Sequence, residues 1–113
     1  MTTPKTEAIR NLNDQYRRYW KVLPNSHVVM TEGILRFSEE DQKSIAKKVQ
    51  NFDQFEDESD PYREHDFGSF RHRDRKIFWK IEYYNCSLRG SAEDPSDVFH
   101  TARVLTIMLA EEY

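Results

Sequence analysis

The segment at residues 60–68 holds the densest group of side chains capable of acid–base chemistry. It reads Asp-Pro-Tyr-Arg-Glu-His-Asp-Phe-Gly and places His65 next to Asp66. An imidazole and a carboxylate can together bind a metal ion or act as general acid and base. The same residues also fit a turn that starts at Asp60-Pro61 and a strand that Phe67 anchors in the core. This structural interpretation is the favoured one.

Two carboxylates and a lysine supply an alternative functional hypothesis. Asp66, Lys80 and Glu82 share one face if a three-residue turn joins the strands that contain them. Several nucleases hold Mg²⁺ and activate water with such a set. Those nucleases place the second carboxylate before the lysine, whereas Lys80-Ile81-Glu82 has the reverse order. Because cross-strand ion pairing explains the same residues, a metal-dependent hydrolase or nuclease is the second hypothesis.

Other chemical signatures are missing from the sequence. His27, His65, His72 and Cys86 lack the paired spacing of a zinc site. No phosphate loop, nucleophile elbow or dinucleotide fingerprint occurs. We therefore assign no catalytic residue, no metal and no cofactor, and we expect Cys86 to be a small buried residue.

Charge is sorted along the chain, although the net charge is only −3. Residues 53–66 hold seven acidic residues against one arginine, and residues 71–76 hold four basic residues against one aspartate. A solvated loop accounts for the acidic residues slightly better, but carboxylates on a rigid surface can also imitate a phosphate backbone and occupy a basic groove. Direct contact of the basic segment with nucleic acid is the less favoured interpretation. The residues predicted to bind a partner are Asp53, Glu56, Asp57, Glu58, Asp60, Glu64, Asp66, Arg73 and Arg75.

The cysteine content and the hydropathy pattern point to the cytoplasm. Cys86 is the only cysteine, so no internal disulfide can form. Met1 is followed by polar residues rather than by an apolar signal segment. The longest strongly apolar stretch, residues 104–110, is far shorter than the roughly 20 residues that a membrane-spanning helix needs.

The hydrophobic pattern predicts one α+β domain over residues 1–113. Helices are expected at residues 6–20 and 38–52 and strands at 27–37, 67–71 and 76–85, with an exposed loop at 53–62. A third helix is favoured from Ser96 onward, and a strand at 104–108 is the alternative. The element order α-β-α-β-β-α predicts a small antiparallel sheet, made of a hairpin and one further strand, packed against about three helices.

The predicted hairpin turn at residues 73–75 sets which side chains face the core. In that register Phe67 opposes Ile81 and lies on the same face as Ile77 and Trp79. We expect this face to pack against Leu12, Val49 and Leu105 of other elements. Arg17, in contrast, is expected on a solvent-facing side of the first helix.

Three stretches of the sequence resemble a known family. They are Ile9-Arg10-Asn11-Leu12-Asn13-Asp14, residues 60–68 together with Phe78-Trp79-Lys80-Ile81-Glu82-Tyr83-Tyr84, and residues 103–113. Together they are similar to short bacterial proteins grouped as domain of unknown function 3768. The resemblance implies a protein carried on plasmids and other mobile elements, and by association a role against host defence. It supplies no catalytic residue.

These observations lead to one functional expectation. The protein is expected to be a non-enzymatic inhibitor that blocks a basic nucleic-acid groove on a host defence complex, such as a CRISPR effector or a restriction enzyme. Its acidic segment is the expected contact surface, and its partner is a protein rather than a membrane.

Overall fold

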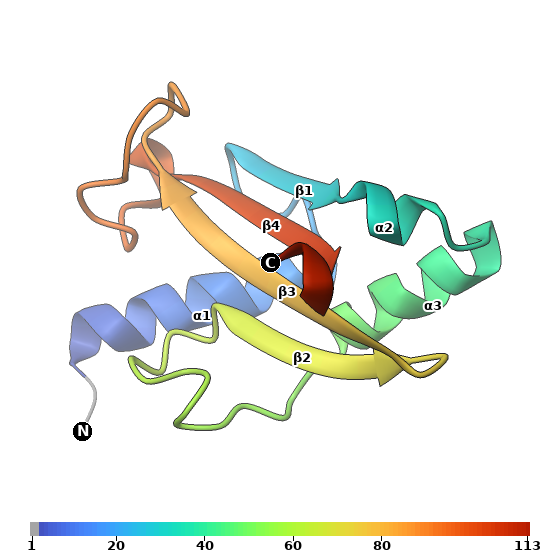
Figure 1. Ribbon diagram of the computed structural model, residues 1–113. Helices are drawn as coiled ribbons and strands as arrows, with labels where there is room; N and C mark the ends of the chain where they lie inside the picture. The colour runs from blue at the N-terminus through green and yellow to red at the C-terminus, as the bar shows by residue number, and fades with distance from the viewer. Residues whose placement is uncertain (1–2) are drawn as a thin grey trace.

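The computed structural model describes residues 3–113, and its two long helices form where the sequence predicts them (Figure 1). Helix α1 (Pro4–Tyr19) begins at Thr3, whose hydroxyl accepts a hydrogen bond from the N–H of Thr6. Helix α3 (Glu39–Gln50) begins at Ser38, and three acidic residues in its first turn suit the positive end of the helix dipole. Apolar residues at helical spacing predicted the first helix, and the capping signal at Ser38 predicted the second.

The strands form one four-stranded mixed sheet in the order β1-β4-β3-β2. Its members are β1 (Ser26–Met30), β2 (Phe67–His72), β3 (Arg75–Tyr84) and β4 (Ala102–Leu109). β1 runs parallel to β4, and the other two pairs are antiparallel. The predicted α+β class is thus confirmed, but the prediction of an antiparallel sheet is wrong, because β1 pairs in parallel with β4 and the sheet has one strand more than expected.

The extra strand replaces the helix that the sequence favoured at the C-terminal end. Only a short 3₁₀ turn, η1 (Val98–His100), precedes β4, and a second turn, η2 (Ala110–Glu112), follows it. The favoured helix is therefore wrong, and the alternative strand is right. β4 lies between β1 and β3, so it is apolar on both faces, with Leu105 and Ile107 on one and the nearly buried Met108 on the other. Burial on both faces hides the alternation that marks a strand.

The predicted strand at residues 27–37 is also shorter than expected. It ends at Met30, and a short helix, α2 (Glu32–Leu35), follows. Gly33 lies in this helix, where its N–H donates to the Glu112 carboxylate at 3.0 Å. A Cβ at residue 33 would collide with Glu112 and Leu109, so the glycine permits close packing rather than a strand bulge.

The hairpin of β2 and β3 has a two-residue turn, so the predicted register is wrong by one residue. Arg73 and Asp74 form the turn with φ angles of 49° and 63°, and Phe67 therefore opposes Lys80. This register turns Phe67 away from the core, although Ile77 and Trp79 point inward as predicted. Because the turn lacks the usual Asn-Gly signal, the sequence did not reveal its length.

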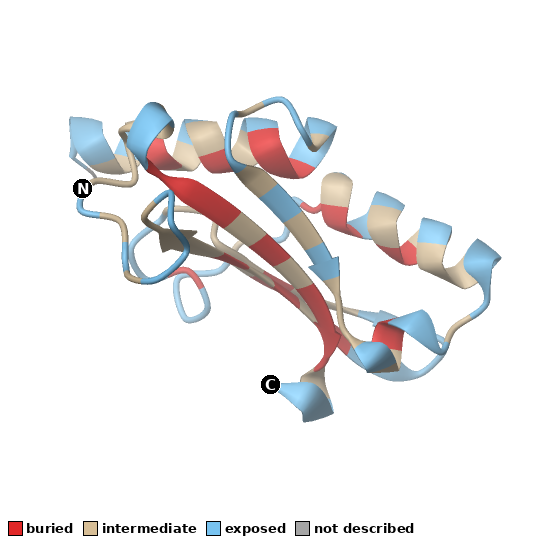
Figure 2. Cartoon of the chain, turned by 90° about the horizontal axis from the view of Figure 1, so that it is seen from above, coloured by how far each residue is buried: buried red, intermediate tan, exposed pale blue. Residues whose placement is uncertain are grey.

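Helices α1 and α3 cover one face of the sheet, and η2 lies on the other (Figures 1 and 2). Gly68 allows the Trp79 and Phe52 rings to pack directly on β2, since a Cβ there would collide with both. Leu12 is only half-buried; Asn13 and Arg17 occupy the inner side of α1 instead. The buried core consists of Tyr16, Ile34, Ile45, Val49, Phe52, Ile77, Trp79, Ile81, Leu105, Ile107 and Leu109. No helix within residues 3–113 has the length and apolar character needed to cross a membrane.

Candidate functional site: the acidic loop and its anchor

The acidic loop, residues 53–66, is folded around the buried carboxylate of Asp60. Asp60 is 3% exposed, and its Oδ1 accepts the N–H groups of Glu64 at 3.0 Å and His65 at 3.1 Å. Its own N–H donates to the carbonyl of Glu56 at 2.8 Å. Arg63 and His65 have positive φ angles of 57° and 55°, so the chain reverses sharply above this carboxylate. Asp60 therefore shapes the loop and is not available to a partner.

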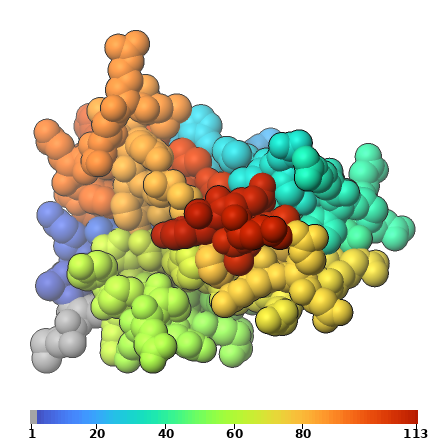
Figure 3. Space-filling model, in the orientation of Figure 1, coloured from blue at the N-terminus to red at the C-terminus, as the bar shows by residue number. Residues whose placement is uncertain are grey.

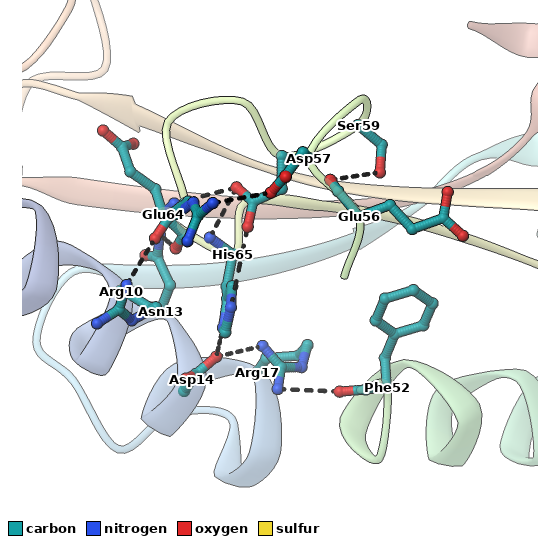
Figure 4. A network of polar contacts seen from close by, with 12 residues as sticks. Arg10, Asn13, Asp14, Arg17, Phe52, Glu56, Asp57, Ser59, Glu64 and His65 are labelled. Carbon is teal, nitrogen blue, oxygen red and sulfur yellow. Dashed lines mark hydrogen bonds and ion pairs between the residues drawn. The ribbon is translucent and has the colours of Figure 1, made fainter. Parts of the chain in front are cut away.

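His65 attaches the loop to helix α1 (Figure 4). Its ring stacks on Phe55, with centroids 3.7 Å apart and planes 4° from parallel. Its Nδ1 lies 2.8 Å from Oδ1 of Asp14, and its Nε2 lies 3.8 Å from Oδ2 of Asp60. A ring stack and two carboxylates thus fix the imidazole on three sides.

Asp14 also balances the charge of Arg17, which the helix buries against the core. Arg17 is 1% exposed, and its guanidinium donates to Asp14 at 2.8 Å and to the carbonyl of Phe52 at 3.2 Å. The guanidinium lies 5.1 Å from the Phe55 ring centroid and 5.5 Å from that of Trp79, within cation–π range. The expectation of a solvent-facing Arg17 is wrong because these partners come from distant segments. The only local signal is the Asp14–Arg17 spacing of three residues.

A second buried network joins the end of the loop to the sheet. Asn13 donates to the carbonyl of Glu64 at 3.0 Å and to the Tyr83 hydroxyl at 2.7 Å. Tyr83 in turn donates to the Glu64 carboxylate at 2.8 Å, and Arg103 Nε donates to Asn13 Oδ1 at 2.9 Å. Burial, with Glu64 nearby, raises the pKa of Tyr83 far above its ordinary value. Glu64 is therefore committed to this internal network.

Asp66 lies on the helix side of the sheet, away from Lys80 and Glu82. Burial raises the pKa of Asp66 to about 6, and the nearby carboxylates of Glu64 and Asp60 contribute to the rise. Lys80 and Glu82 form an ion pair at 3.1 Å on the opposite face. The register thus separates the three residues of the alternative hypothesis. Among residues 3–113, no group of three or more His, Cys, Asp or Glu side chains is placed to hold a metal ion.

Four predicted contact residues of the acidic loop remain exposed, namely Asp53 at its start and Glu56, Asp57 and Glu58 at its tip. Asp57 pairs with Arg63 at 3.3 Å, and both side chains are more than half exposed. Beside this tip lies a shallow cleft of about 350 Å³, lined in part by Arg10, Glu56 and His65. The loop therefore presents carboxylates to solvent from a base that is fixed by buried contacts.

Two of the four basic residues at the hairpin tip pair with carboxylates within the protein. Arg73 pairs with Asp41 of α3 at 2.8 Å, and Arg75 pairs with Glu111 at 2.5 Å. His72, 7% exposed, lies 2.9 Å from the same Asp41 carboxylate and 3.0 Å from the ammonium of Lys48. Hydrogen bonds from Arg73 and His72 lower the pKa of Asp41 to about 2. The two predicted contact residues at this tip therefore already have carboxylate partners.

Cys86 is exposed, so the prediction of a buried cysteine is wrong. Its sulfur lies 3.5 Å from the carbonyl of Phe99 and 3.5 Å from the side-chain nitrogen of Asn25. The loop after β3 leaves the sheet before this residue, which is why the aromatic strand does not bury it.

The fold and the site define a small α+β protein with a four-stranded mixed sheet, helices on one face and a buttressed acidic loop at one edge. Residues 30–112 match the family model described as protein of unknown function DUF3768, and the chain belongs to that family. Neither a curated protein nor a solved structure matches the chain.

Proposed function

We propose that this protein is a non-enzymatic, cytoplasmic binding protein whose acidic loop occupies a basic groove on a partner protein. The observation that carries the proposal is the contrast between the two parts of the loop. Its base is fixed by Asp60, His65 and Asp14, whereas its tip exposes three carboxylates. An ordered array of negative charges costs less entropy on binding than a mobile one.

The negative charge of the loop tip indicates which class of protein would bind it. A groove that binds nucleic acid is lined by lysine and arginine, and it attracts an acidic surface through long-range steering. A defence complex of the host cell, such as a CRISPR effector or a restriction enzyme, is the partner that we propose. Its inhibition would result from competition with the nucleic acid for the same groove.

The alternative, a metal-dependent hydrolase, is less well supported. It needs Asp66, Lys80 and Glu82 in one site, and Asp66 lies on the opposite face of the sheet from the other two.

The test compares two triple variants in affinity capture from bacterial cells, with mass spectrometry as the readout. One variant reverses the charge at the loop tip with Glu56→Lys, Asp57→Lys and Glu58→Lys. The matched control reverses three exposed carboxylates elsewhere, with Glu32→Lys, Glu39→Lys and Glu93→Lys. We expect the tip variant to lose a partner that the wild type and the control both retain.

The captured partner then serves in a competition assay with its nucleic acid. We expect the wild-type protein to displace the nucleic acid, and we expect the affinity to fall as salt concentration rises. A partner captured equally by all three proteins would contradict the role of the loop tip. Simultaneous binding of protein and nucleic acid would contradict competition for one groove.

A further inference from the structure

The face of the sheet opposite α1 and α3 carries an uncompensated pair of cations. Arg71 of β2 and Lys76 of β3 are direct cross-strand neighbours, and both are exposed. Like charges in this position destabilise a sheet. Among residues 3–113, neither side chain forms an ion pair with a carboxylate; the Arg71 guanidinium contacts only the carbonyl of Asp74, at 3.4 Å. An anion between the two side chains would remove the repulsion.

Aromatic rings lie next to this cation pair on the same face. Phe67 and Phe78 are 5.0 Å apart, and Tyr113 lies 5.7 Å from Phe78. Tyr113 is 75% exposed, and Figure 3 shows the C-terminal residues lying across the sheet beside β2 and β3. The rings therefore form a platform that begins at Phe78, two residues along β3 from Lys76 of the cation pair.

Lysine side chains connect the two features. The ammonium of Lys76 lies 5.5 Å from the Phe78 centroid, and that of Lys80 lies 5.6 Å from the Tyr113 centroid. A planar group on the rings would thus have beside it Lys76, which is unpaired within residues 3–113, whereas Lys80 is already paired with Glu82. Two carboxylates near the platform have internal partners, since Glu82 pairs with Lys80 and Glu111 with Arg75.

We propose that this face binds single-stranded nucleic acid. A phosphate bridges Arg71 and Lys76, and a neighbouring base stacks on the ring platform at Tyr113. The phosphates of a single strand match the cations, and its exposed bases match the rings. An acidic peptide would use the cations alone. A duplex hides its bases and cannot stack on the platform. This surface is separate from the acidic loop tip and does not depend on the proposed function.

The less favoured interpretation of the sequence places nucleic-acid contact at residues 71–76, with Phe70, Phe78 and Trp79 as the flanking rings. The observed register of β2 and β3 changes which aromatic rings lie on the same face as the basic residues. Trp79 faces the helices, and only Phe78 of the three shares the face with Arg71 and Lys76. Phe67 and Tyr113 complete the platform.

The test measures fluorescence anisotropy of labelled oligothymidylate, oligouridylate and a DNA duplex, each of about 10 to 15 nucleotides or base pairs, at about 50 and 200 mM salt. We expect at least one single strand to bind more tightly than the duplex and to weaken with salt. The two single-stranded arms distinguish DNA from RNA as the source of the ligand.

Two variant pairs assign the contacts. Lys76→Glu should abolish binding while keeping or raising thermal stability, because the introduced carboxylate lies opposite Arg71. Its control, Lys47→Glu at an exposed position of α3, should retain binding. Tyr113→Ala should weaken binding about five- to hundredfold, and Tyr113→Phe should retain it.

Three outcomes would overturn the proposal. They are absence of binding to either single strand at low salt, equal affinity for the duplex, and equal loss of binding in Lys76→Glu and Lys47→Glu. Retained affinity in Tyr113→Ala would also exclude the stacking platform.

Discussion

The acidic loop and the hairpin tip are attached to the helices by the same type of contact, with different consequences. At the loop, His65 contacts Asp14 of α1 at 2.8 Å; at the tip, His72 contacts Asp41 of α3 at 2.9 Å. Asp14 also forms an ion pair with Arg17, whose side chain is 1% exposed. Asp41 forms an ion pair with Arg73, whose side chain is 70% exposed.

The difference lies in the charge that remains when the contact is broken. Arg73 can turn into water if Asp41 is lost, so its charge does not stay buried without a partner. Arg17 is enclosed by rings and cannot do so. The cost of losing a carboxylate therefore depends on the burial of its partner more than on the distance between them.

The largest expected effect comes from Asp14→Ala. Loss of this carboxylate leaves Arg17 buried with the Phe52 carbonyl as its remaining hydrogen-bond acceptor, so we expect the free energy of unfolding to fall by about 3 to 5 kcal/mol. Asp41→Ala should cost clearly less. Urea denaturation of both variants measures the comparison. Equal losses in the two variants would contradict it, and a second substitution, Arg17→Met, should recover part of the loss in Asp14→Ala.

The next effect concerns Asp66, whose pKa in the folded protein is about 6 against an ordinary value of 3.8. A raised carboxyl pKa means that stability is lost as pH rises from about 4 through about 6, because the folded state must release a proton that it holds more tightly. Asp66→Asn should therefore stabilise the protein by about 1 to 3 kcal/mol near pH 8 and by almost nothing below about pH 4. Denaturation midpoints across this pH range provide the measurement. A pH-independent difference would show that ionisation of Asp66 is not the cause.

Asp41 should produce the opposite pH dependence at the hairpin tip. Its folded pKa of about 2 lies below the ordinary value of 3.8, so its contribution is present above about pH 4 and is lost as pH falls toward 2. Asp41→Asn should flatten this part of the acid-unfolding curve. The carboxyl pKa can also be measured directly by NMR titration, and an ordinary value would contradict the pairing with Arg73 and His72.

The smallest expected effect is on stability at the loop tip. Glu56→Lys, Asp57→Lys and Glu58→Lys together should change the free energy of unfolding by under about 1 kcal/mol, because the side chains are exposed and only Asp57 has an ion-pair partner among the described residues. Thermal unfolding checks this. A loss comparable with that of Asp14→Ala would mean that the tip is part of the anchor rather than a free surface.

The sequence alone determined the features that depend on a few neighbouring residues. Ser38 and the acids after it located α3, and the alternation through Ile77, Trp79 and Ile81 identified the inner face of β3. The concentration of carboxylates in residues 53–66 was visible from composition. Such signals are local because caps and side-chain periodicity act over one or two turns.

Only the tertiary structure decided which of these carboxylates are exposed and free to contact a partner. Asp60, Glu64 and Asp66 looked equivalent to Glu56 in the sequence, yet they are drawn into contacts with α1 and the sheet. The two-residue turn decided which face Phe67 occupies, and the central position of β4 decided that residues 102–109 form a strand. Each outcome depends on partners far away in sequence, so no pattern within the segment itself could specify it.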